Sequence, residues 1–271
     1  MRKPGEKTAA EMRAALSGIR CFLLDMDGTF YLGDRIIEGS MEFLQKVEQT
    51  GRSYLFLTNN SSRSVQHYVE KLGRLGLHVG EDKILTSGQA AAQYLKREYP
   101  GKRVFLLGNP SLREEMEKHG IALEDEHPDL VLVGFDTTLD YAKMTRVCDL
   151  VREGLPYIAT HPDFNCPTES GFIPDIGAIM AFIEASTERK ADVIIGKPCG
   201  EIVRAAQERT GLAPGEMAMV GDRLYTDIAL GRNNGLTSIL VLTGETKRED
   251  VNDANAPDFI FENIGEIAAF F

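Results

Sequence analysis

Two pairs of aspartates each follow an apolar run. Asp25 and Asp27 lie in the segment DMDGT, directly after CFLL, and Asp222 and Asp227 lie in GDRLYTD, directly after MAMV. Open α/β sheets place ligands at the carboxyl ends of their strands. Clustered carboxylates raise one another's pKa unless a cation lies between them, so a hard divalent ion such as Mg²⁺ is their natural partner. The alternatives are a turn built from ordinary turn formers and a loop with a helix-capping aspartate.

Two further polar features follow apolar runs. Thr58-Asn59-Asn60 ends the run SYLFLT, and its hydroxyl, amide and backbone N–H groups could bind an anion, although for the tripeptide alone an N-cap and a turn are the favoured interpretation. Lys197 follows DVIIG, where a lone lysine is usually a solvated charge. Together the four features supply a nucleophilic carboxylate, a second carboxylate for acid/base work, a metal site and donors for phosphate oxygens. This combination predicts phosphoryl transfer through aspartate.

The elements that must position these residues are short apolar runs, typical of strands buried on both faces of a parallel sheet. The runs are residues 21–25, 53–58, 104–108, 129–135, 156–160, 192–196, 217–221, 238–243 and 258–262. The segments between these runs have the apolar spacing of helices. Helices are predicted over 65–75, after the cap residue Ser64, and from Asn109-Pro110 to His119-Gly120. Two more are predicted over 139–151 and around 202–206, before Gly211. The alternation predicts an α/β fold with a doubly wound parallel sheet.

Composition narrows the classes of function. The 271 residues are 43% hydrophobic and 26% charged, as in an ordinary globular protein of about two domains. The net charge of −11, without a basic cluster, argues against nucleic-acid or membrane binding. The four cysteines form no C-x-x-C pair, and neither a signal peptide nor a membrane span is evident, so we expect a cytoplasmic protein.

The order and spacing of the motifs resemble the haloacid dehalogenase (HAD) superfamily of aspartyl phosphatases, whose four motifs match Asp25–Thr29, Thr58, Lys197 and Gly221–Asp227. The segments DMDGTFYLGDRIIEGS, FLTNNSSRS, IIGKP and MVGDRLYTDI are similar to the NagD-like, 4-nitrophenylphosphatase-like branch, which carries an inserted α/β cap. Roughly 130 residues separate Asn60 from Lys197, enough for a domain. The resemblance implies a Rossmann-like core of residues 1–84 and 188–271, with the cap at 85–187.

The resemblance also implies roles for the motif residues. Asp25 attacks phosphorus and becomes an aspartyl-phosphate, while Asp27 protonates the leaving oxygen and then activates water. Mg²⁺ is held by the Asp25 carboxylate, the Asp27 backbone carbonyl and Asp222, and Asp227 orients metal-bound water. The residues implied to bind phosphate are Gly28, Thr58, Asn59, Asn60 and Lys197.

A loop of the cap, residues 161–171, resembles the segment that faces the core active site and reads the leaving group in this branch. Its candidate specificity residues are Asp163, Asn165 and Cys166, although for Cys166 alone a small buried thiol is the favoured interpretation. The sequence departs from the family here, with His161 where relatives often carry Asn and Pro174-Asp175 where they carry Pro-Gly.

We therefore expect a Mg²⁺-dependent phosphatase acting on small phosphomonoesters such as sugar, nucleotide or other metabolite phosphates. Relatives in this branch often form homodimers. The competing hypotheses are a phospho-accepting signalling module, a phosphotransferase of the same superfamily, and a catalytically inactive binding protein. Asp27 and the inserted cap argue against the signalling module, and the presence of every motif residue argues against an inactive protein.

Overall fold

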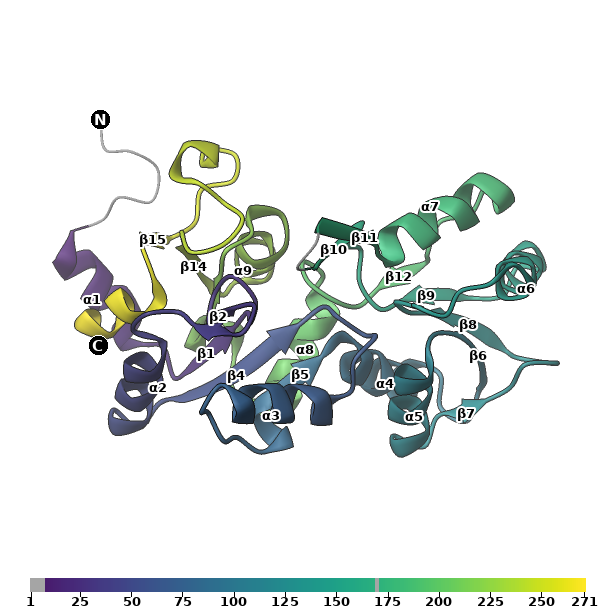
Figure 1. Ribbon diagram of the computed structural model, residues 1–271, viewed down its shortest axis with the longest axis horizontal. Helices are drawn as coiled ribbons and strands as arrows, with labels where there is room; N and C mark the ends of the chain where they lie inside the picture. Colours follow the sequence, from purple (N-terminus) through teal and green to yellow (C-terminus); the bar gives the residue numbers. More distant parts are fainter. Residues whose placement is uncertain (1–7, 169–170) are drawn as a thin grey trace. The chain divides into compact units, whose positions relative to one another are not determined.

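The chain folds into two compact units, each built around its own parallel sheet (Figure 1). The computed structural model describes residues 8–168 and 171–271. The first unit consists of the chain up to Leu57, Val69–Leu85 and Lys197–Phe271. The second unit consists of Thr58–Tyr68 and Thr86–Gly196.

The first unit contains a six-stranded sheet of order β15-β14-β13-β1-β4-β5. Its strands are β1 (Cys21–Leu24), β4 (Ser53–Thr58), β5 (Ile84–Thr86), β13 (Met217–Gly221), β14 (Thr237–Val241) and β15 (Phe259–Phe261). β1 pairs in parallel with β4 on one side and with β13 on the other. The chain winds from β1 towards β5 in one direction and from β13 towards β15 in the other. This confirms the predicted doubly wound sheet, with its topological switch point between β1 and β13.

Helices cover this sheet and explain why its strands are apolar on both faces. They are α1 (Ala9–Ser17), α2 (Ser40–Gln49), α8 (Gly200–Thr210) and α9 (Ala229–Asn234), with a hairpin of β2 (Tyr31–Leu32) and β3 (Arg35–Ile36). Helix α3 (Val65–Arg74) belongs to this unit from Val69 onwards. Short 3₁₀ turns occur at Glu81–Lys83, Pro214–Glu216, Arg248–Asp250 and Ile264–Phe270. Every residue of β1 is buried, and Phe22 packs edge-on against Phe43 of α2, with ring centroids 5.2 Å apart.

The second unit contains a five-stranded sheet of order β12-β9-β8-β6-β7, in which all pairings are parallel. Its strands are β6 (Arg103–Leu107), β7 (Ala122–Leu123), β8 (Leu130–Val133), β9 (Tyr157–Ala159) and β12 (Val193–Ile194). Its helices are α4 (Ser87–Glu98), α5 (Pro110–Lys118), α6 (Tyr141–Arg152) and α7 (Ile176–Thr187). α4 packs with α5 and α6 with α7, and the two pairs cover opposite faces of the sheet (Figure 1). An antiparallel hairpin, β10 (Asn165–Thr168) and β11 (Gly171–Pro174), precedes α7.

The nine apolar runs identified in the sequence are all strands, and the predicted helix signals hold where they can be compared. The Asn109 side chain caps α5, with Pro110 in its first turn, and Gly211 ends α8 in a left-handed conformation. One assignment differs from the structure. The predicted domain boundary at residue 188 places β12 in the core, but β12 pairs with β9 in the second unit. The sequence could not distinguish the two placements, because an apolar strand fits a buried parallel sheet equally well in either unit.

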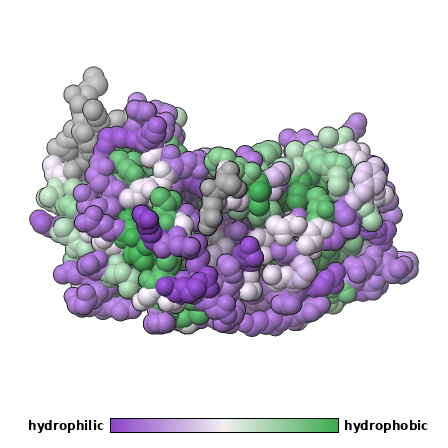
Figure 2. Space-filling view, in the orientation of Figure 1, coloured by the Kyte–Doolittle hydropathy of each residue, from purple (hydrophilic) through white to green (hydrophobic). Residues whose placement is uncertain are grey.

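The face seen in Figure 2 is largely hydrophilic, with scattered apolar patches. None of the helices in the described residues is long and apolar enough to cross a membrane.

The aromatic core of the first unit offers a test of its packing. Phe56 of β4 is fully buried and lies 4.9 Å from the Phe30 ring centroid. We expect Phe56→Ala to lower the free energy of unfolding by about 3–5 kcal/mol, because it removes buried apolar surface and leaves a cavity. Urea unfolding followed by circular dichroism measures this. Leu32→Ala, at a site that is 56% exposed, is the control and should change stability by less than about 0.5 kcal/mol. Equal unfolding midpoints for the two variants would contradict the packing described.

Candidate functional site

The candidate site of the first unit starts at the carboxyl end of β1. The Asp25 backbone N–H donates to the Val220 carbonyl of β13 at 2.9 Å, which extends the strand pairing and holds Asp25 at the switch point. The carboxylate of Asp25 accepts a hydrogen bond from the Lys197 ammonium. Its side chain is 15% exposed and therefore stays accessible to a small molecule.

Lys197 joins three parts of the first unit. Its Nζ donates to the Asp25 carboxylate, to Asp227 Oδ1 at 2.7 Å and to the Leu57 carbonyl of β4 at 3.3 Å. The side chain is only 3% exposed. Burial opposes its charge, but the two carboxylates outweigh that penalty and raise the pKa of the lysine. Lys197 is therefore a fixed, permanently charged ammonium.

Asp222 and Asp227 come from β13 and the turn that follows it. Asp222 directly follows the strand, and Asp227 lies in a single π-helical turn over Leu224–Ile228. One carboxylate oxygen from each lies within 4.8 Å of the other and of an Asp25 oxygen. Burial, followed by the charge of the neighbouring aspartates, raises the pKa of Asp222. Burial likewise raises the pKa of Asp227, although Lys197 opposes the rise.

This donor set fits a hard divalent cation. Three carboxylates converge, and Lys197 forms ion pairs with Asp25 and Asp227. Asp222 is held by the Glu245 backbone N–H, which donates to its Oδ2 at 2.7 Å, and the Thr29 hydroxyl lies 3.5 Å from its Oδ1. Three carboxylates face one ammonium here, and their mutual repulsion adds to burial in raising the pKa of Asp222. Oxygen ligands in excess of positive charge are what Mg²⁺ or Ca²⁺ requires.

Asp27 is more open than the other three aspartates. Its side chain is 48% exposed, and its Oδ2 lies 3.9 Å from the Lys71 ammonium of α3. Partial burial raises the pKa of Asp27, Lys71 lowers it, and Asp25 raises it further. The net rise favours the protonated form, which a proton donor needs.

Two glycines allow close approach to Asp222. Gly28 has φ +87°, and a Cβ there would lie 2.6 Å from Asp222 Oδ2. A Cβ on Gly244 would lie 2.0 Å from the same oxygen. The Thr243 hydroxyl donates to the Gly28 carbonyl at 2.6 Å and ties the two segments together. The sequence analysis missed Gly244, although a glycine just after the run SILVLT was an available signal. Lys71 was also missed, and its place on a helix gave no signal.

Thr58, Asn59 and Asn60 belong to the second unit, where their side chains have partners. The Asn59 amide donates to both carboxylate oxygens of Asp163, at 3.3 and 3.2 Å. Asn60 Oδ1 accepts from the Ser62 backbone and hydroxyl at 2.8 Å each, and Thr58 Oγ1 accepts from the Asn60 backbone at 3.2 Å. Asn60 therefore forms the turn that the sequence allowed as an alternative. The phosphate-binding roles of the three residues stay predictions.

The predicted specificity loop also lies in the second unit. His161 is buried, with Nε2 3.0 Å from Asp175 Oδ1 and Nδ1 3.0 Å from the Thr160 hydroxyl, so the two departures from the family pattern contact each other. Asn165 and Cys166 lie on β10, where Asn165 is exposed and Cys166 is only partly buried. Glu169 and Ser170 of this loop lie outside the described residues.

Comparisons with known proteins agree on one family. A family model described as haloacid dehalogenase-like hydrolase matches residues 22–122, and a related HAD-hydrolase-like model matches residues 194–267. The acid sugar phosphatase of Staphylococcus aureus (strain MRSA252) is 36% identical over 252 residues, covering 92% of this chain and 97% of that protein.

Solved structures show the same similarity over nearly the whole chain. The 4-nitrophenylphosphatase of Thermotoga maritima is 49% identical, with a TM-score of 0.91 over 94% of this chain and 98% of the other. NagD from Escherichia coli K-12 is 32% identical, with a TM-score of 0.85 over 92% of this chain and 98% of the other.

The contact between Gly244 and Asp222 gives a prediction for cation binding. We expect Gly244→Ala to weaken Mn²⁺ binding about tenfold or more, because the new Cβ displaces a ligand carboxylate by more than the tolerance of a metal site. Electron paramagnetic resonance of free Mn²⁺ during titration measures the affinity. Gly215→Ala is the control, because its Cβ would meet no atom within 4 Å. Unchanged Mn²⁺ affinity in folded Gly244→Ala would show that Asp222 is not a ligand.

Proposed function

The chain belongs to the haloacid dehalogenase-like hydrolases, as a NagD-like phosphatase, and we propose that it hydrolyses small phosphomonoesters with Asp25 as the nucleophile. One observation carries this proposal: the buried Lys197 ammonium contacts both Asp25 and Asp227, at the point where Asp222 also converges. A carboxylate beside a fixed cation can approach an anionic phosphate group with less repulsion.

The two aspartates of DMDGT divide the chemistry. Asp25 attacks phosphorus, the bond to the leaving oxygen breaks, and the Asp27 proton passes to that oxygen. Water then attacks the aspartyl-phosphate, gives its proton to Asp27 and releases inorganic phosphate, which restores the starting state. The environments support this division, because Asp25 contacts an ammonium whereas partial burial raises the pKa of Asp27. One carboxyl therefore lies beside a cation while the other has a raised pKa, as a nucleophile and a proton donor require.

We propose Mg²⁺ as the cation of this site, held by the Asp25 and Asp222 carboxylates and the Asp27 backbone carbonyl. Bound there, Mg²⁺ supplies positive charge that offsets the negative charge developing on the transferred phosphoryl group. Asp227 accepts hydrogen bonds from Lys197 and from the Arg223 backbone N–H at 3.1 Å, so it holds the lysine and the loop in place. These contacts favour a positioning role for Asp227, which we do not include among the Mg²⁺ ligands.

We assign the first unit as the catalytic core and the second as the cap. The substrate class we propose is a small phosphorylated metabolite, and the names of the relatives, an acid sugar phosphatase and a 4-nitrophenylphosphatase, support it. Thr58, Asn59, Gly28 and Lys197 would supply the phosphate contacts, and Asp163, Asn165 and Cys166 would contact the leaving group. The cytoplasmic location and the homodimer stay predictions from the sequence.

Replacing the nucleophile tests the reaction class. We expect Asp25→Asn to lower kcat for 4-nitrophenyl phosphate by several orders of magnitude, because the amide cannot form the aspartyl-phosphate. The exposed Asp34→Asn, in the same unit, is the control and should keep near-normal activity. Wild-type enzyme should release many equivalents of inorganic phosphate per chain. A single equivalent would instead support the phospho-accepting module.

Removing the cation tests the metal assignment. We expect EDTA to abolish hydrolysis of 4-nitrophenyl phosphate, and excess Mg²⁺ after dialysis to restore it, because the carboxylate cluster otherwise repels the substrate. Circular dichroism before and after chelation separates loss of the cation from loss of fold. Full activity in metal-free buffer containing EDTA would overturn the proposal.

The contact between Lys71 and Asp27 gives a pH prediction. The Lys71 ammonium lowers the pKa of Asp27, so Lys71→Gln should raise it. A general acid acts in its protonated form, and the basic limb of the profile of kcat/KM against pH should therefore move to higher pH. Lys46→Gln on α2 is the control and should leave the limb in place. A basic limb that stays fixed or moves to lower pH in Lys71→Gln would exclude Asp27 as the acid.

A further inference from the structure

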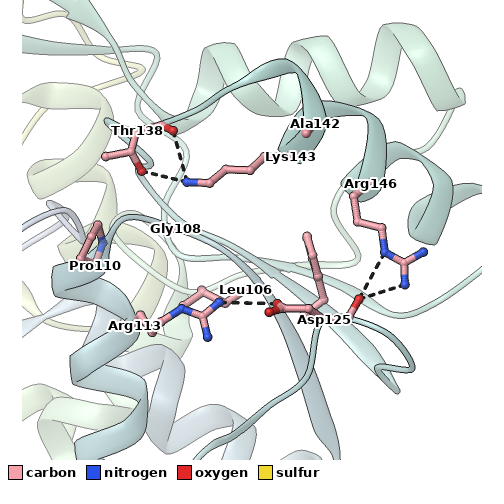
Figure 3. A pocket seen from close by; sticks show the side chains of 10 residues that line it. Leu106, Gly108, Pro110, Arg113, Asp125, Thr138, Ala142, Lys143 and Arg146 are labelled. Atoms are coloured by element: carbon pink, nitrogen blue, oxygen red, sulfur yellow. Dashed lines mark hydrogen bonds and ion pairs between the residues drawn. The ribbon is translucent and has the colours of Figure 1, made fainter.

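The second unit contains a cavity of about 440 Å³ beside β6 (Figure 3). Phe105, Leu106 and Gly108 line it from the carboxyl half of this strand and the residue that follows. β7 pairs with β6 only at the start of β6, where Ala122 lies opposite Arg103 and Leu123 opposite Val104. The carboxyl half of β6 therefore has no pairing with β7. The cavity therefore opens where the sheet edge is uncovered.

The topology of the sheet makes this place suitable for a ligand. β6 and β8 are neighbours, and the chain leaves β6 through α5 towards β7 on one side but leaves β8 through α6 towards β9 on the other. Adjacent strands whose connections diverge form a topological switch point, where open α/β sheets bind ligands beyond the carboxyl ends of the strands. Pro110 of α5 and Thr138, in the connection before α6, both line the cavity.

Two guanidinium groups border the cavity with little neutralising charge. Arg146 donates to the backbone carbonyls of Asp125 and Glu126, at 3.0 and 2.6 Å, and has no carboxylate within ion-pair distance among the described residues. Within the described part of the chain, Arg113 contacts one carboxylate, that of Asp125, which is 66% exposed and 3.5 Å away. Figure 3 shows both side chains converging on Asp125 from α5 and α6. Lys143 differs, because the buried Asp136 neutralises it at 2.7 Å.

The chemistry of the lining defines the ligand class. Uncommitted guanidinium N–H groups match the oxygen pairs of carboxylates and phosphates. The apolar part of the lining comes from Phe105, Leu106, Pro110 and Ala142. A cavity of this volume, with an apolar lining and a few convergent polar groups, has the character of a small-molecule site. The chain has a net charge of −11, yet Arg113, Lys143 and Arg146 all line this one cavity.

We propose that this cavity binds a small organic oxyanion, with its carboxylate or phosphate on Arg113 and Arg146 and its apolar body over Leu106. This site lies wholly within the second unit and uses none of the residues assigned to hydrolysis. It is therefore independent of the proposed function.

The test uses the full chain in EDTA with two probes, phenylphosphonate and benzoate, and with benzyl alcohol as the neutral control. Backbone amide shifts of Gly108 and Ala142, followed by NMR, report binding at the cavity. We expect at least one anionic probe to shift both amides in a saturable manner and benzyl alcohol not to shift them. The probe that binds more tightly distinguishes a phosphate site from a carboxylate site.

The arginine variants assign the binding to the cavity. Arg113→Gln with Arg146→Gln should weaken the preferred probe about tenfold or more, since charged hydrogen bonds are lost. Arg113→Gln alone, which leaves the Arg146 contacts to the 125–126 backbone intact, should weaken it in the same direction if the double variant fails to fold. Arg204→Gln on α8 is the matched control and should bind as the wild type does. Absence of shifts with both probes, or unchanged affinity in folded Arg113→Gln, would overturn the proposal.

Discussion

The ion pairs of Lys197 with Asp25 and Asp227 are the interaction on which the site of the first unit depends. Taking an isolated carboxylate out of water costs several kcal/mol, and three of them converge here. The ammonium lowers that cost and ties the ends of β1 and β4 to the turn after β13. Because three carboxylates face one ammonium, the remaining negative charge favours a divalent cation.

Close approach of backbone segments is the second constraint. Asp222 lies between two chain segments that come within contact distance of its carboxylate only because Gly28 and Gly244 have no side chain. The Thr243 hydroxyl and the Glu245 backbone N–H then lock these segments around it. A site built this way is rigid before binding, which lowers the reorganisation needed when a cation or a phosphate group is bound.

The second unit carries its own buried polar network. Thr160, His161 and Asp175 form a continuous chain of hydrogen bonds. Asp163, two residues after His161, accepts a hydrogen bond from the Asn59 amide. His161 and Asp175 are buried and hydrogen-bond to each other. Replacing one alone would therefore leave the other buried without this hydrogen bond. The two positions at which this chain departs from the family pattern are therefore hydrogen-bonded partners.

The sequence by itself determined the strands, the doubly wound sheet and the residues that follow each strand, because burial on both faces and turn chemistry leave local patterns. Tertiary structure alone decided that β12 joins the second unit, that Gly244 packs on Asp222 and that Lys71 lies beside Asp27. These outcomes depend on segments far apart in the chain. A local pattern records how deeply a segment is buried, but the partner that buries it, and hence the charge and pKa of its side chains, is set by the packing of distant residues.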